Sequence, residues 1–126
     1  MKLSTMPTAE EPMAKLPTTL TGWQLLCWTI ADEHGFHEPG TNDNMAAWVA
    51  NLHGEVSELW EAYRADTLRE TCEKDARIDN AEEELADIII RTLDIAGQMG
   101  INIERAMRIK CEYNMGRPYL HGGKKA

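Results

Sequence analysis

Apolar residues recur along most of the chain at intervals of three and four, which is the period of an amphipathic helix. Four such segments are predicted, at about residues 20–34, 45–66, 81–99 and 103–115. The alternation of apolar and polar residues that indicates a strand occurs in none of them. The sequence therefore predicts an all-α fold, a bundle of four or five helices.

Polar residues and glycines mark the expected helix ends. Thr21 and Gln24 fit a capping box at the start of the first helix, and Asn80 and Asn102 are the expected N-caps of the third and fourth. The predicted stops are Gly35, Gly100 and Gly116. The polar segment 67–79 is either a loop or a short exposed helix.

Each of the two longest helices carries one apolar stripe, which we expect to face the core. The stripe of the second helix consists of Met45, Val49, Leu52, Val56, Leu59 and Tyr63. That of the third consists of Leu85, Ile88, Ile89, Thr92, Ala96 and Met99.

The length of 126 residues favours one domain, residues 20–126, preceded by a flexible arm over residues 1–19 with three prolines. No apolar run approaches the roughly 20 residues that span a bilayer, so no membrane partner is expected. The first residues lack the apolar core of a secretory signal, which favours an intracellular, cytoplasmic protein. The three cysteines are odd in number and form no metal-binding pair, so free thiols are expected.

The formal net charge of −8 argues against binding to nucleic acid, whose phosphates need lysine and arginine partners. It does not exclude a nucleotide bound through a metal ion, because the bound cation dominates the local field.

Carboxylates three residues apart on a helix lie on one face, with about 5–6 Å between their Cβ atoms. The pairs of the form Glu-x-x-Glu or Glu-x-x-Asp are Glu55/Glu58, Glu58/Glu61, Glu70/Glu73 and Glu84/Asp87. At roughly 100° per residue, Glu55 lies about 80° from the centre of its stripe, and Glu84 holds nearly the same position on the third helix. The pairs Glu55/Glu58 and Glu84/Asp87 therefore lie on the same side of the apolar stripe of their helices. They converge if the two helices pack antiparallel.

Four converging carboxylates repel one another unless a cation or protons are present. An all-oxygen set favours Mg²⁺ or Mn²⁺ over zinc. A di-iron centre of the ferritin type needs Glu-x-x-His pairs, and the chain contains none.

The fourth helix begins with an apolar face that continues as Lys110, Asn114 and Arg117. Lys110 and Arg117 are candidates for binding phosphate, and Asn114 for binding phosphate or sugar. An equal alternative is that the lysine and arginine only complement the helix dipole. Lys124, in the glycine-rich tail, is a further candidate for phosphate, with disorder as the alternative. Trp48 is the preferred candidate for stacking on a base, although tryptophans more often lie in a core or an interface.

The segments GEVSELWEAYRAD, EEELADIIIRTLDIAG and KCEYNMGRPYLHGGKK resemble the MazG-like all-α nucleotide pyrophosphohydrolases, whose signature is ExxE followed by ExxD. The resemblance covers roughly residues 20–125, and its compact form is similar to versions found in phages. It implies a homodimer or homotetramer with sites partly built at subunit contacts. It also implies cleavage of a nucleoside triphosphate to monophosphate and pyrophosphate, with a purine, guanine in particular, as the favoured base.

The mechanistic hypothesis is hydrolysis assisted by two or three Mg²⁺ or Mn²⁺ ions held by the four carboxylates. Glu55 is the preferred acceptor of the proton of the attacking water. One alternative is a dUTP-specific enzyme on the same scaffold. The other is a helical dimerisation module without catalysis, whose glutamates are merely solvated.

Overall fold

The fold is all-helical, as the apolar periodicity predicted. The computed structural model describes residues 16–40 and 43–119. Within them lie four helices, α1 (Leu20–Glu33), α2 (Met45–Arg64), α3 (Asn80–Met99) and α4 (Ile103–Met115). These residues contain no strand, only an isolated bridge between Thr71 and Asp79. Residues 1–15 of the predicted arm and the tail from residue 120 lie outside the described ranges.

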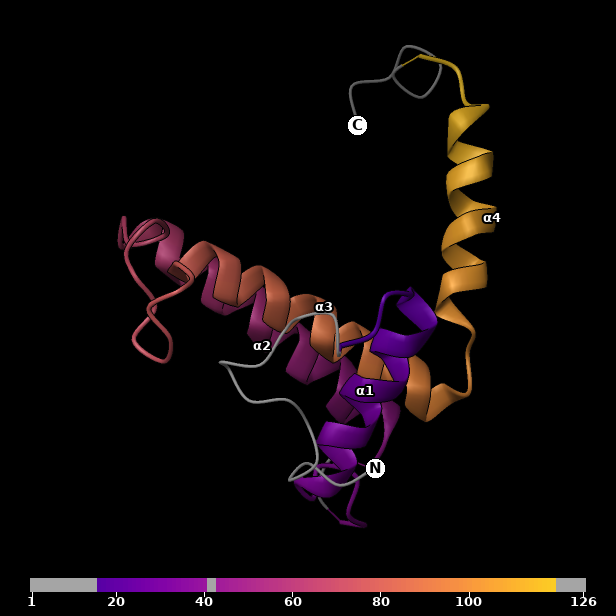
Figure 1. Ribbon diagram of the computed structural model, residues 1–126, viewed down its shortest axis with the longest axis horizontal. Coiled ribbons are helices and arrows are strands. Elements are labelled where there is room, and N and C mark those ends of the chain that lie inside the picture. Colours follow the sequence, from indigo (N-terminus) through magenta and orange to yellow (C-terminus); the bar gives the residue numbers. More distant parts are fainter. Residues whose placement is uncertain (1–15, 41–42, 120–126) are drawn as a thin grey trace.

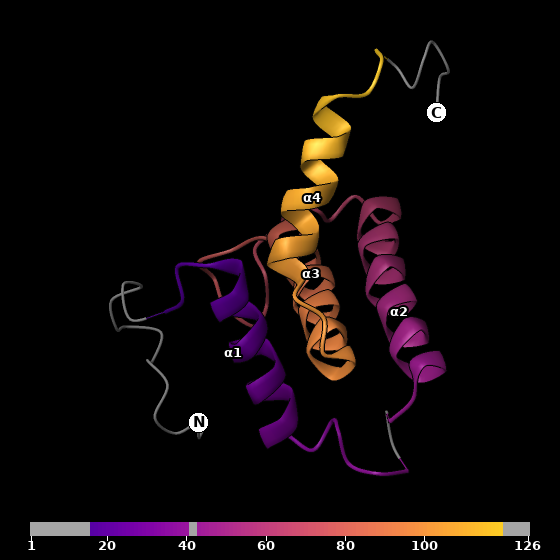
Figure 2. The same ribbon diagram turned by 90° about the vertical axis from the view of Figure 1, so that its right-hand side faces the viewer.

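Helix α3 is the central element, because it packs against both α1 and α2. Figure 2 shows α1 and α2 on either side of it. Helix α4 packs against the start of α1, and its C-terminal part extends beyond the other three helices (Figure 1). No helix within the described ranges has the length and apolar character needed to cross a membrane.

The N-caps of α1 and α3 differ from those predicted. The α1 cap is Thr19, whose side chain accepts a hydrogen bond from the Gly22 amide. Thr21 and Gln24 instead link α1 to α4 and to the residues just before it. The Thr21 hydroxyl donates to the Glu104 carboxylate at 3.2 Å, and Gln24 donates to the Ile101 carbonyl at 2.8 Å. Long-range partners therefore take the side chains that the local pattern assigned to a capping box.

The α3 cap is Asp79 instead of Asn80, and it forms a complete capping box with Glu82. The Asn80 side-chain amide donates to the Thr67 carbonyl at 2.9 Å, which fastens the preceding segment to α3. Segment 67–79 is a loop, so the alternative of a short helix is wrong. The predicted cap Asn102 and the left-handed stop at Gly100, with φ of 66°, are confirmed.

The core of the single chain is small, and the predicted stripes are only partly buried. Leu26, Cys27, Cys72, Leu93 and Ala96 are the buried apolar residues of the described ranges. Stripe residues Val56, Leu85 and Ile89 are 47%, 50% and 56% exposed. Three helices in one layer leave part of each stripe without a neighbour, so these positions are on the surface of one chain.

Helices α1 and α3 approach each other closely at Gly97. A Cβ atom at this position would lie 2.7 Å from Cδ1 of Trp28, far inside van der Waals contact. The Trp28 ring is held in place because its Nε1 donates to the Gln98 side-chain oxygen at 2.7 Å. The absence of a side chain at Gly97 therefore sets the spacing of the two helices.

We expect Gly97→Ala to lower the free energy of unfolding by about 1–3 kcal/mol, because the added methyl group overpacks this contact. The matched control is Gly54→Ala in α2, where a Cβ atom would meet nothing within 4 Å. That change should raise the free energy of unfolding by about 0.5–1 kcal/mol through helix propensity. Urea unfolding at one protein concentration measures both, and equal effects would contradict the close approach.

Candidate metal centre

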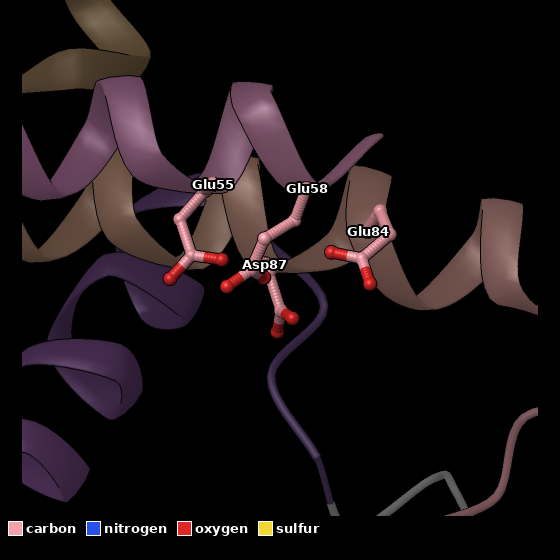
Figure 3. Close-up of side chains that lie close together, drawn as sticks. All are labelled: Glu55, Glu58, Glu84 and Asp87. Carbon is pink, nitrogen blue, oxygen red and sulfur yellow. The ribbon is translucent and has the colours of Figure 1, made fainter. Parts of the chain in front are cut away.

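Four carboxylates from two helices come together on the α2–α3 pair. Glu55 and Glu58 lie one turn apart on α2, and Glu84 and Asp87 lie one turn apart on α3. One carboxylate oxygen of each residue lies within 4.8 Å of the corresponding atoms of the other three. Figure 3 shows the four side chains gathered along the two helices. The convergence expected from their angular positions is confirmed, and their role as ligands stays a prediction.

The four charges interact in an antiparallel arrangement. Glu58 is the charged neighbour that most raises the pKa of Glu84, and Glu55 is the one that most raises the pKa of Asp87. The first residue of the α2 pair thus faces the second of the α3 pair, as two helices that run in opposite directions require.

Burial and repulsion favour a proton on the α3 carboxylates. Burial, followed by the nearby Glu58 carboxylate, raises the pKa of Glu84 to about 7. Its Oε2 atom is buried and has no hydrogen-bond partner among the described residues. Burial and then Glu55 raise the pKa of Asp87. Positive charge therefore stabilises the clustered carboxylates, and either protons or a cation can supply it.

The residue types and the arrangement fit a hard divalent cation. Each carboxylate offers oxygen atoms, which Mg²⁺ and Mn²⁺ prefer as ligands. The unpartnered Glu84 oxygen is an acceptor that a cation would satisfy. A site of carboxylates on two facing helices is also how helical bundles build metal centres.

Two basic side chains adjoin the cluster, and neither was predicted from the sequence. Arg91 donates from Nη2 to Oε1 of Glu55 at 3.0 Å. Lys74, in the loop before α3, pairs with Glu83, next to Glu84 in the chain. Arg91 follows Asp87 by four positions, so its place on the same face of α3 was a signal available in the sequence. The position of Lys74 depends on the loop conformation, which no local pattern specifies.

The basic residues predicted on the fourth helix do not adjoin the cluster in this chain. Lys110, Asn114 and Arg117 are exposed and lie toward the projecting end of α4 or just beyond it (Figure 1). Lys110 and Arg117 instead approach the Tyr113 ring, at 4.8 Å and 6.0 Å from its centroid. Lys124 lies outside the described residues.

Trp48 lies half-buried in the first turn of α2. The aromatic residue beside the cluster is Phe36, which lines a cavity of about 140 Å³ together with Glu55, Asp87 and Asp94. Asp94 is buried and accepts a hydrogen bond from Nε2 of His37 at 2.8 Å. The same ring contacts Asp32 through Nδ1 at 3.1 Å, so His37 ties the end of α1 to α3. Neither His37 nor Phe36 belongs to a motif that sequence reasoning could identify.

In comparisons with known proteins, no family model, curated protein or solved structure matches this chain.

The raised pKa of Glu84 gives a test in the metal-free protein. Folded Glu84 keeps its proton up to about pH 7, whereas an unfolded glutamate loses it near pH 4.5. The folded state therefore binds more protons between these values, and its free energy of unfolding falls as pH rises from about 5 to 7. The lowered pKa of Glu83 acts below this window.

We therefore expect Glu84→Gln to gain in Tm relative to the wild type as pH rises from 5 to 8 in EDTA. Thermal melts across this range measure the difference. Glu70→Gln, at an exposed loop position, is the control and should give a difference that does not change with pH. A constant difference for Glu84→Gln as well would show that the carboxylate is not destabilised by its neighbours.

Proposed function

We propose that the protein is a metal-dependent nucleoside triphosphate pyrophosphohydrolase. The observation that carries the proposal is the convergence of Glu55, Glu58, Glu84 and Asp87 within 4.8 Å from two facing helices. Merely solvated glutamates gain nothing from such proximity, since like charges repel. The order of the ExxE and ExxD pairs, and the resemblance that they carry, support the same reaction class.

The four carboxylates hold Mg²⁺ or Mn²⁺, with two or three ions in the site. When bound, the ions polarise the phosphates and lower the pKa of a bound water. Glu55, Glu58, Glu84 and Asp87 all act as ligands. Glu55, which lies at the end of the cluster next to Arg91, is our choice for the residue that accepts the proton of the attacking water. Attack at the α-phosphorus releases the monophosphate and pyrophosphate.

The favoured substrate is a purine nucleotide, with guanine first, on the resemblance to compact phage forms. A dUTP-specific enzyme on the same scaffold is the second candidate. Product analysis with the eight common NTPs and dNTPs plus dUTP, each with Mg²⁺ or Mn²⁺, separates the two. Monophosphate with pyrophosphate supports the proposal, and diphosphate with orthophosphate would overturn the attack position. Turnover of dUTP alone would establish the second candidate.

A helical module without catalysis predicts no response to metal and nucleotide. An enzyme should instead gain thermal stability with Mn²⁺ and a nucleotide, because both bind only the folded state. No change in Tm and no product with any nucleotide would favour the module.

The ligand assignment predicts which glutamates are needed. Glu58→Gln and Asp87→Asn should each lower kcat by on the order of 100-fold or more, because the remaining groups hold the metal poorly. Glu61→Gln is the matched control, since Glu61 belongs to the overlapping pair on α2 but forms an exposed contact with Arg64 at 3.5 Å. Steady-state rates at saturating metal measure the effect. Near wild-type rates for Glu58→Gln and Asp87→Asn would refute the assignment.

We further propose that a second copy of the chain completes the site, in a homodimer or homotetramer. The small core and the half-exposed stripes on α2 and α3 leave apolar surface that one chain does not cover. The end of α4 that carries Lys110, Asn114 and Arg117 projects away from the carboxylates of its own chain. In the assembly, these residues of one subunit therefore reach the phosphates bound at the carboxylates of the other. Tyr113 and Ile109, 63% and 50% exposed on α4, are apolar surface for the same contact.

A shared site predicts complementation between two inactive variants. Asp87→Asn and Lys110→Ala should each be nearly inactive alone. After mixing under conditions that exchange subunits, activity should return to roughly a quarter to a half of the wild-type level, because some sites then receive both intact groups. Mixing Asp87→Asn with Glu58→Gln is the control, since both changes lie in one cluster. No recovery in the first mixture would place Lys110 outside a shared site.

A further inference from the structure

A cavity of about 140 Å³ opens between α1 and α3 directly beside the carboxylate cluster. The apolar residues of its wall are Cys27, Ile30, Ala31, Phe36 and Ile90. Glu55 and Asp87 of the cluster also line it, as do Asp94 and Arg91. A ligand that binds metal at the cluster can therefore extend into this cavity without leaving the protein surface.

Arg91 lies at the junction between the cluster and the cavity. Its guanidinium contacts Glu55 at 3.0 Å on one side and lies 5.9 Å from the centroid of the Phe36 ring on the other. The side chains of Arg91 and Glu55 are 27% and 16% exposed, so water screens their interaction only in part. Arg91 is thus the counter-charge of one member of the cluster and part of the cavity wall.

A divalent cation that binds Glu55 would compete with Arg91 for this carboxylate. The Oε1 atom that accepts the hydrogen bond from Arg91 is also an oxygen available to a divalent ion. A guanidinium and a divalent cation on the same carboxylate repel each other, because both are positive and only a few ångströms apart. The same guanidinium already lies near the Phe36 ring, and Arg91 already lines the cavity, so these neighbours remain when the contact with Glu55 is lost.

The cavity fits the base of a nucleotide better than its phosphates. Its wall is mainly apolar and carries an aromatic ring, a surface on which a planar base packs. Asp87 and Asp94 also line it and would repel a phosphate group. Every base presents ring nitrogen or carbonyl acceptors, and a guanidinium donates to such atoms.

We propose that Arg91 is a binding residue that metal releases: when Glu55 takes a divalent cation, Arg91 turns into the cavity between α1 and α3 and donates to the base of the nucleotide. Metal binding thereby prepares the base site, so metal and nucleotide bind with positive coupling. This inference rests on the proposed function, since it assumes that the cluster holds metal and that the ligand is a nucleotide.

The first test measures Mn²⁺ binding to the full chain without nucleotide. Arg91→Gln should bind Mn²⁺ more tightly than the wild type, by roughly two- to fivefold, because the competing ion pair is gone. Arg64→Gln is the matched control, an exposed arginine of α2 whose partner Glu61 lies outside the cluster. Weaker or unchanged Mn²⁺ binding by Arg91→Gln would overturn the proposal, since Arg91 would then support Glu55 or have no influence on it.

The second test compares two kinds of metal-dependent ligand. One kind is the α,β-methylene analogues of the four common dNTPs, and the other is tripolyphosphate, which has no base. At saturating Mn²⁺, Arg91→Gln should weaken the best-bound analogue by on the order of tenfold and leave tripolyphosphate binding unchanged. An equal loss for both would place Arg91 on the phosphates and overturn the base assignment. Unchanged binding of both would overturn it as well.

The wild-type protein gives a readout that does not depend on the folding of a variant. Titration with Mg²⁺ should shift the NMR signal of the Arg91 Nε–H group and leave that of Arg64 in place. A fixed Arg91 signal in a protein that does bind Mg²⁺ would overturn the release step alone. A wild type that binds neither Mg²⁺ nor Mn²⁺ would instead refute the proposed function, so the two failures are distinguishable.

Discussion

The antiparallel packing of α2 against α3 is the contact on which the candidate site depends. Each helix alone carries an ordinary pair of carboxylates beside its apolar stripe, and the two members of a pair lie one helical turn apart. Packing brings the two pairs within 4.8 Å, and burial then removes part of the water that would screen them. The raised pKa values of Glu84 and Asp87 are the direct consequence of this arrangement.

The protein offsets this repulsion unevenly along the cluster. Arg91 pairs with Glu55 at one end, whereas at the other end Lys74 pairs with Glu83 and leaves an oxygen of Glu84 without a partner. A buried acceptor without a partner costs free energy, so this end of the cluster is where a cation would stabilise the fold most. The proposed binding of a cation would thus be linked to stability through the same four side chains.

The single layer of helices explains which parts of the fold are closely packed and which keep exposed apolar side chains. Gly97 allows α1 to lie close to α3, and the bonds from Thr21 and Gln24 fasten the start of α4 to α1. Among the described residues, no hydrogen bond of this kind joins the outer part of α4 to the other helices, and large apolar side chains there are exposed. Apolar surface of this kind on a chain with a small core is characteristic of subunits that associate.

The sequence by itself determined the helical fold, because the period of the apolar residues and the stops at Gly100 and Gly116 are local properties of the chain. It also determined which carboxylates share a helical face, since a fixed rotation per residue relates spacing to direction. The sequence did not predict the caps at Thr19 and Asp79, because the side chains of Thr21, Gln24 and Asn80 form hydrogen bonds with distant segments. Only the tertiary structure decided that Arg91 meets Glu55, that Phe36 and Asp94 line the adjoining cavity, and that the basic end of α4 lies apart. These relations depend on how helices pack and loops close, and neither is encoded in the spacing of residues within one segment.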